Sequence, residues 1–236
     1  MPKLSIVIPV YNEEELVAPV TEEIIKVIGS DPDYVEIIII NDGSTDKTEF
    51  VLQKLKSKYP ILRVINFEKN AGQSAAMACG FLEARGEYVV TLDGDGQNDP
   101  SDIPKIIQLL DQFHVVCGIR SQRRDKFTKR ISSKIAKWFR QKVLWDNIED
   151  IGCSLKGFHR APLQKLFFFD GAHRFLPILL EMEGYSVGQI KVNHRPRNAG
   201  VSKYTNLGRL AKTWMDLLGV YWMRKRKLNY RIRKSL

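Results

Sequence analysis

Cysteine is scarce in this chain of 236 residues, which contains only Cys79, Cys117 and Cys153. Their number is odd, they lie far apart, and none of the intervals matches the short spacing of metal-binding cysteines. We therefore expect neither a disulfide framework nor a zinc site. We interpret all three cysteines as small buried apolar residues of a protein in a reducing compartment.

A signal peptide is also missing. The opening apolar run, Leu4 to Val10, contains Pro9 and passes into Tyr11-Asn12-Glu13, without the small residues of a cleavage site. The sequence therefore predicts a cytoplasmic protein.

No apolar run is long enough to span a bilayer. The most apolar C-terminal stretch, 207–223, is interrupted by Arg209, Lys212 and Asp216, whereas a spanning helix needs roughly 20 mostly apolar residues. Any membrane association is then expected to be peripheral, on the cytoplasmic face, either at the lipid interface or through a small integral membrane partner.

Negative charge is in deficit. The chain has 37 Lys and Arg against 27 Asp and Glu, which gives a formal net charge of +10, and its isoelectric point is near 9.5. Such a balance indicates an anionic partner. Composition alone leaves three open: nucleic acid, an anionic membrane surface, or phosphorylated substrates.

What the first half does contain is a regular alternation of apolar runs and helical patterns. At 44% hydrophobic residues, the chain can bury one large core with a short appendage. The expected strands are Leu4–Val10, Val35–Ile40, Leu62–Ile65, Tyr88–Leu92 and Val115–Ile119. The expected helices are 14–28, 45–57, 72–84 and 102–112, with Ser44 and Ser101 as capping candidates. This repetition predicts an α/β fold with a parallel sheet covered by helices.

The most informative segment follows the fourth expected strand. Asp93 and Asp95 are one residue apart at the strand end, so both carboxylates leave it on the same side and can share a hard divalent cation. Gln97 adds a neutral oxygen. Because such an ion is commonly completed by substrate phosphates, the segment predicts a diphosphate ligand. A solvated acidic turn is the plain alternative.

Other strand ends are polar too, and ligands of such sheets bind beyond the carboxyl ends of the strands. Asp42 is expected to bind a base or ribose there, whereas plain helix capping is favoured for Ser44 to Asp46. Pro9, Tyr11 and Glu13 are candidates for the wall around a base, with a simple strand exit as the rival. Gly72 lies in Asn70-Ala71-Gly72-Gln73, which offers amide donors near phosphates or only close helix packing.

These motifs, in this order, resemble family 2 glycosyltransferases of the GT-A fold. The resemblance rests on Ser5 to Glu13, Asn41 to Asp46, Asn70 to Gly72 and Asp93 to Gln97. Together with the later run His194 to Tyr204, the chain is similar to the branch that includes dolichol-phosphate mannose synthase and undecaprenyl-phosphate sugar transferases.

The resemblance implies a Rossmann-like GT-A domain over residues 1–204, with a nucleotide-sugar half at about 1–120 and an acceptor half at about 121–204. An amphipathic helix and polybasic tail would occupy 205–236. It also implies an inverting, metal-dependent transfer from a UDP- or GDP-sugar to a polyprenyl phosphate, with Mg²⁺ or Mn²⁺ as cofactor. The donor would be held by Pro9, Tyr11, Glu13, Asp42, Gly72 and Asp93, and the metal by Asp93, Asp95 and Gln97.

A phosphate acceptor suits the basic residues of the second half. The expected acceptor-phosphate residues are Arg120, Arg130, Arg195, Arg197, Ser202 and Lys203. Arginine forks bind phosphate in a bidentate manner. A phosphate oxygen is already ionised near neutral pH, so the transfer needs no strong general base. We expect Asp95, Arg120, Arg195 and Arg197 to be catalytic.

Asp150 marks the alternative acceptor. In relatives that glycosylate a hydroxyl, an acidic residue at about this point acts as the base, so Asp150 is also a candidate catalytic residue. The Gln-x-x-Arg-Trp motif of processive polysaccharide synthases is absent, and a single transfer is expected. A family 2 transferase that acts on a hydroxyl of a saccharide or lipid, with Asp150 as base, stays open.

Two stretches have the pattern of basic amphipathic helices. In the first, Phe127 to Phe139, aromatic and aliphatic residues at helical spacing are surrounded by lysine and arginine; the second, Leu207 to Trp222, is followed by a polybasic tail. Helices of this kind lie in the headgroup region of anionic membranes. Packing as ordinary surface helices is the alternative.

Two other classes fit poorly. A dinucleotide oxidoreductase needs G-x-G-x-x-G after its first strand, and Pro9 to Glu13 contains no glycine. The acidic strand ends would repel the phosphate backbone of a nucleic acid, so no nucleic-acid partner is expected.

Overall fold

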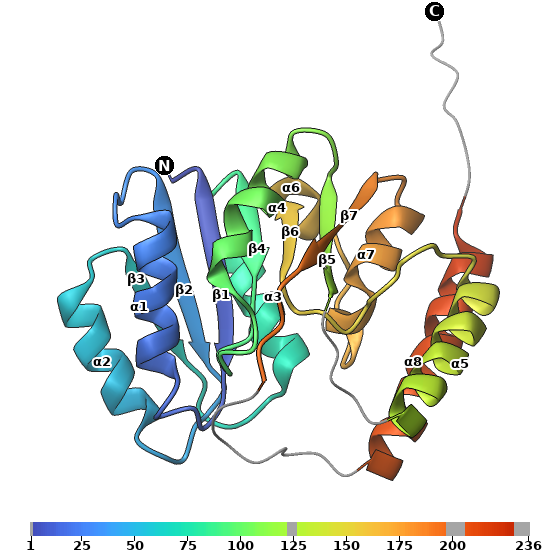
Figure 1. The fold of residues 1–236 in the computed structure, drawn as a ribbon, viewed down its shortest axis with the longest axis horizontal. Coiled ribbons are helices and arrows are strands. Elements are labelled where there is room, and N and C mark those ends of the chain that lie inside the picture. Colours follow the sequence, from blue (N-terminus) through green and yellow to red (C-terminus); the bar gives the residue numbers. More distant parts are fainter. Residues whose placement is uncertain (1, 122–126, 197–205, 229–236) are drawn as a thin grey trace, which may run out of the picture.

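The structure, a computed structural model, describes residues 2–121, 127–196 and 206–228. Its centre is a seven-stranded sheet in the order β3-β2-β1-β4-β6-β5-β7 (Figure 1). The strands are β1 Leu4–Val10, β2 Val35–Asn41, β3 Leu62–Asn66, β4 Tyr88–Thr91, β5 Val115–Arg120, β6 Lys156–His159 and β7 Val187–Val192. Only β6 runs antiparallel to its neighbours, β4 and β5.

Helices cover both faces of this sheet. The helices are α1 Val17–Ile28, α2 Thr48–Lys58, α3 Gln73–Glu83, α4 Ile103–Leu110, α5 Phe127–Leu144, α6 Arg160–Leu163, α7 Ala172–Met182 and α8 Asn206–Arg226, with a 3-10 turn at Pro100–Asp102. Apolar side chains of α1, α2 and α4 share one core cluster with β1 and β2. Those of α3, α6 and α7 form the cluster on the other face. Strands β1 and β2 are almost continuously apolar because both their faces are buried.

The five expected strands and four expected helices are confirmed, with shifts at their ends. Both capping predictions are wrong. The hydroxyl of Ser44 accepts a hydrogen bond from the Asn12 amide, and the carboxylate at the start of α2 is that of Asp46, which accepts from the Thr48 amide at 2.9 Å. At the 3-10 turn, Asp99 accepts from the amide of Ser101 at 3.0 Å.

The helices α5 and α8 run side by side, in the same direction, at one end of the molecule (Figure 1). A third apolar cluster, which includes Leu144, Phe175, Leu217 and Val220, joins them to α7. The expected boundary at residue 204 falls outside the described residues. No helix in the described part of the chain is long and apolar enough to cross a membrane.

Candidate active site

The polar strand ends meet at one edge of the sheet. Strands β1, β2, β3, β4, β5 and β7 all run in the same direction, with β6 reversed between β4 and β5. The carboxyl ends of β4 and β5, which carry Asp93 and Arg120, therefore lie on the same edge although β6 separates them. This arrangement brings together residues that are distant in the sequence.

The two carboxylates of the Asp93 to Asp95 motif have different surroundings. Asp93 is half-buried and accepts a hydrogen bond from Nε2 of Gln73, the first residue of α3, at 2.7 Å. Burial, and then the charge of Asp95, raises the pKa of Asp93 to about 6. Asp95 instead accepts the Gln97 amide at 3.1 Å, which shapes the turn after the strand.

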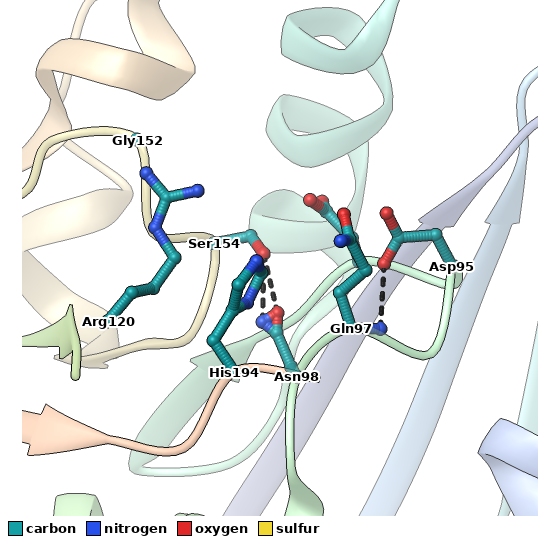
Figure 2. Close-up of a pocket in the computed structure, with 8 residues that line it drawn as sticks. Asp95, Gln97, Asn98, Arg120, Gly152, Ser154 and His194 are labelled. Carbon is teal, nitrogen blue, oxygen red and sulfur yellow. Dashed lines mark hydrogen bonds between the residues drawn. The ribbon is translucent and has the colours of Figure 1, made fainter. Parts of the chain in front are cut away.

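A solvent-open pocket lies over this turn. It is lined by Asp93, Asp95, Gln97, Asn98, Arg120, Gly152, Ser154 and His194. Figure 2 shows Arg120 on one side of the pocket and Asp95 on the other, with Gln97 between them. Carboxylate and amide oxygens are the donors that Mg²⁺ and Mn²⁺ accept, so this end of the pocket fits a divalent cation. The opposite, cationic end fits an anion.

Arg120 and Asp150 form a two-point ion pair. Nε and Nη2 of Arg120 donate to the two carboxylate oxygens of Asp150 at 2.7 and 2.8 Å. One of these oxygens also accepts the Gly152 amide at 3.2 Å. Both side chains are largely buried, with 16% and 10% of their surface exposed. Asp150 thus orients the Arg120 guanidinium, which faces the pocket. Both carboxylate oxygens of Asp150 accept hydrogen bonds in this arrangement.

Asp42 binds a neighbouring loop with its carboxylate. It is 4% exposed and accepts from the amides of Ala71 and Gly72 at 2.7 and 2.9 Å and from the side chain of Asn70 at 2.9 Å. Gly43 permits this approach, because a Cβ there would lie 2.4 Å from the Lys69 carbonyl carbon. Asp42 and Gly72 therefore meet, as expected of one binding wall; their contact with a nucleotide stays a prediction.

The loop after β1 is tied to the loop before α2. The Glu13 amide donates to the hydroxyl of Thr48 at 2.9 Å, and the Asn12 side chain accepts the Thr45 amide at 2.7 Å. Pro9, Tyr11 and Glu13 do not line the pocket that contains Asp93 and Asp95. Their expected role beside a base stays a prediction.

Arg195 is held by acidic side chains. Its guanidinium donates to both oxygens of Glu23 on α1 at 2.9 and 2.8 Å and lies 3.0 Å from Asp99. Its amide donates to the Gln97 carbonyl at 2.8 Å. This segment is thereby fastened over the turn that contains Asp95 and Gln97. Arg197, Ser202, Lys203 and the side chain of Arg130 lie outside the described residues.

Several pocket residues were not predicted. Asn98 and Ser154 hydrogen-bond to each other at 2.8 and 3.1 Å, and His194, which pairs with Asn98, places its ring beside them (Figure 2). His194 begins a run that the sequence analysis singled out, and Ser154 lies four residues after the candidate Asp150, but neither residue type stands out there. Only the reversed strand β6, which the periodicity did not reveal, brings the 150–154 loop to β4.

The part of the chain that contains this pocket matches a known protein family. The sequence model described as "Glycosyl transferase family 2" matches residues 5–167, which include the Asp93 to Gln97 turn and the 150–154 loop. The chain belongs to glycosyltransferase family 2. It is therefore a glycosyltransferase.

Two similar family members act on polyprenyl phosphates according to their names. The dodecaprenyl-phosphate galacturonate synthase of Rhizobium johnstonii is 34% identical over 231 residues, 95% of this chain and 68% of that protein. The undecaprenyl-phosphate 4-deoxy-4-formamido-L-arabinose transferase of Edwardsiella ictaluri is 31% identical, over 91% of this chain and 66% of its own length. The chain thus spans about two thirds of the length of these family 2 relatives.

Solved structures share the GT-A fold. A mannosyltransferase from Pyrobaculum calidifontis, in complex with GDP-Man and Mn²⁺, superposes with a TM-score of 0.71 at 18% identity, over 98% of this chain and 66% of that one. Glucosyl-3-phosphoglycerate synthase from Mycobacterium tuberculosis, with Mn²⁺ and UDP, has a TM-score of 0.70 at 18% identity, over 94% of this chain and 80% of that one. The fold of this family 2 enzyme is therefore GT-A.

Proposed function

We propose that this glycosyltransferase moves a sugar from a nucleotide-sugar to a polyprenyl phosphate at a membrane surface, with inversion at the sugar carbon. One observation carries the proposal: the acidic residue near the acceptor, Asp150, is bound at both oxygens by Arg120. A carboxylate held in this way is poorly disposed to remove a proton. A phosphate acceptor needs no base, since its oxygen is already ionised near neutral pH.

The donor end of the pocket supports a divalent metal. Asp93, Asp95 and Gln97 would hold Mg²⁺ or Mn²⁺, which would neutralise the charge that develops on the leaving diphosphate. Glucosyl-3-phosphoglycerate synthase has been crystallised with either metal. The hydrogen bond from Gln73 orients Asp93. Pro9, Tyr11, Glu13, Asp42 and Gly72 would form the nucleotide wall.

The acceptor phosphate would bind at the cationic end. Arg120 faces the pocket there, and its pairing with Asp150 fixes the guanidinium plane in advance, which lowers the entropic cost of binding. The segment after Arg195 would supply Arg197, Ser202 and Lys203, and α5 would supply Arg130. Arg195 would act mainly by fastening that segment to α1 through Glu23.

The pair of helices α5 and α8 supports a membrane surface. The chain has four tryptophans, and all of them lie on or beside these helices with 45% to 62% of their surface exposed: Trp138, Trp145, Trp214 and Trp222. Tryptophan prefers the interface between lipid and water. Lysines and arginines of the same helices would contact anionic headgroups. The enzyme would bind peripherally, on the cytoplasmic face, where its three free thiols suit a reducing compartment.

The decisive test is sugar transfer from radiolabelled UDP- and GDP-sugars, with Mg²⁺ or Mn²⁺, to undecaprenyl and dolichyl phosphate. The donor panel should include the sugars named in the relatives, galacturonate and 4-deoxy-4-formamido-L-arabinose. The matching dephosphorylated polyprenols are the control acceptors. We expect transfer to the phosphates only, and transfer to a hydroxyl acceptor alone would contradict the proposal.

An Asp150→Asn variant separates the two acceptor chemistries. Asparagine keeps one oxygen for Arg120, so a phosphate-acceptor enzyme should lose less than about tenfold in rate, because loss of a true general base costs about 10² to 10⁴. Arg120→Ala should impair use of the phosphate far more, since it removes the charge-assisted fork. The reverse ranking would favour a hydroxyl acceptor with Asp150 as base.

A further inference from the structure

A buried ammonium lies directly beneath the pocket. Lys156 begins β6 and is 3% exposed, and it is the only buried lysine among the described residues. Its neighbours in the sheet are Thr91 on β4 and Cys117 on β5. Asp93 follows Thr91 by two residues.

The ammonium is bonded to the loop above it. Nζ of Lys156 donates to the carbonyl of Ile151 at 3.3 Å and to the carbonyl of Cys153. These two carbonyls lie on either side of Gly152, which lines the pocket. Lys156 therefore holds the turn of the 150–154 loop from below.

That loop carries the cationic end of the pocket. Asp150 fixes the Arg120 guanidinium, and Ser154 hydrogen-bonds to Asn98. The Ser154 carbonyl accepts the hydroxyl of Thr91 at 2.7 Å, which joins the loop to β4. A displacement of the loop would thus move Arg120 relative to the carboxylates on β4.

Burying a charged ammonium is costly unless it is well bonded. An apolar side chain of similar length, such as methionine, would fill the same space between Thr91 and Cys117 without that cost. A lysine at this place is explained by what its charge and donors do for the loop above it.

We infer that Lys156 is a positioning residue of the transfer reaction, which holds the 150–154 loop and, through Asp150, sets the Arg120 fork against the metal-binding carboxylates. This inference rests on the proposed function for its kinetic consequence. Its structural consequence, a fixed loop, can be measured independently.

The first experiment is kinetic. Lys156→Met should lower kcat/KM for the polyprenyl phosphate by about 10- to 100-fold, since small misplacements of positioning groups have effects of this size. Binding of the nucleoside diphosphate with Mn²⁺, measured by calorimetry, should stay close to that of the wild type. Phe158→Leu is the matched control: Phe158 is buried on the same strand two residues away, and its truncation perturbs packing but removes no hydrogen bond.

Coupling to Arg120 separates positioning from general destabilisation. If Lys156 acts through Arg120, the double variant Lys156→Met/Arg120→Ala should be no slower than Arg120→Ala alone. Multiplied losses would contradict the inference. Lys156→Arg keeps the charge and the donors and should recover most of the transfer that methionine loses, and an arginine variant as slow as the methionine variant would also contradict it.

The second experiment needs no transfer assay. Cys153 is 1% exposed and belongs to the loop that Lys156 holds, so its burial reports on the position of the loop. In Lys156→Met, labelling of Cys153 by iodoacetamide should become at least several-fold faster, while half-buried Cys79, which is remote from the loop, serves as the internal reference. A protected Cys153 together with wild-type transfer overturns the inference. A wild-type enzyme that transfers to no polyprenyl phosphate overturns the proposed function instead, and the labelling result then still decides whether Lys156 fixes the loop.

Discussion

Asp93, the first carboxylate of the turn after β4, is buried enough for its ionisation to be perturbed. The half-buried carboxylate of Asp93 has a folded-state pKa of about 6 against a usual value of 3.8, because burial and the neighbouring charge of Asp95 both disfavour its ionised form. Holding this carboxylate ionised at neutral pH therefore costs folding free energy. A bound divalent cation would offset that cost.

The sign of this effect gives a pH-dependent prediction. Since the folded-state pKa is raised, the penalty is present above about pH 6 and disappears as the pH falls towards 4. Asp93→Asn should stabilise the metal-free protein at pH 7.5 by at most about 3 kcal/mol. Thermal unfolding in EDTA measures the difference, which should vanish near pH 4. A variant that is less stable than the wild type at pH 7.5 would refute the assignment of this penalty.

Asp95 is the second carboxylate of the proposed metal site. Asp95→Asn removes the charge at almost constant volume, so transfer should be abolished while the fold is retained. The stabilisation that Mn²⁺ and a nucleoside diphosphate give in a thermal shift assay should be lost as well. Asp33→Asn is the charge-matched control, because Asp33 lies in an exposed turn before β2 and outside the pocket. Unaltered turnover in Asp95→Asn would remove the metal assignment.

At the scale of elements, the exposed tryptophans of α5 and α8 predict membrane binding. Trp138 is 60% exposed and Trp222 is 62% exposed. Replacing both with alanine should weaken binding to anionic liposomes by at least about tenfold, which corresponds to 1.4 kcal/mol. Phe50→Ala is the matched control, since Phe50 is 56% exposed on α2. Sedimentation with liposomes compares the variants, and equal losses in the two would contradict an α5–α8 membrane face.

A charge variant of α8 has to spare its packing contacts. Arg224 and Lys227 bond to backbone carbonyls of Leu144 and Met182, so truncation from residue 224 would disturb the helix pair itself. The Lys225 ammonium lies 4.6 Å from the centre of the Trp145 ring, so Lys225 has to be kept as well. Arg226 is exposed, and replacing it with glutamate leaves all of these contacts in place. Weaker sedimentation of this variant at moderate salt would then report on lipid attraction alone.

The elements differ in how far the sequence predicts them. Strands such as β1 and β2 are almost continuously apolar because helices cover both faces, so their sequence pattern is unambiguous. The short reversed strand β6 begins with Lys156, and β7 mixes exposed and buried positions, so neither has a clear pattern. The acidic turn after β4 could be predicted because its residues are adjacent in sequence, whereas its binding of a metal stays a prediction. The pairing of Arg120 with Asp150, and of Arg195 with Glu23, depends on tertiary contacts that no local pattern contains.

At the scale of the whole molecule, the distribution of charge supports the proposed binding to an anionic surface. The net charge is +10, yet the pocket beyond β4 contains two carboxylates. The excess of positive charge therefore lies outside the donor site. Helices α5 and α8 each begin near the active-site edge of the sheet and run away from it (Figure 1), so a membrane that contacts them would lie beside the cationic end of the pocket.

This arrangement predicts that salt slows transfer to the membrane-bound acceptor but hardly weakens binding of the donor nucleotide. Transfer to undecaprenyl phosphate in anionic vesicles should slow markedly as NaCl rises from 0.15 to 1 M, because the Debye length shrinks from about 8 Å to about 3 Å and screens the attraction between the enzyme and the lipid surface. Binding of the nucleoside diphosphate with Mn²⁺ should change much less, since several of its proposed contacts would be metal bonds and hydrogen bonds inside the pocket. Neutral vesicles with the same acceptor content are the control and should support slow transfer with little dependence on salt. Equal salt dependence in anionic and neutral vesicles would show that the positive charge serves the acceptor phosphate alone and that the membrane face contributes nothing to the rate.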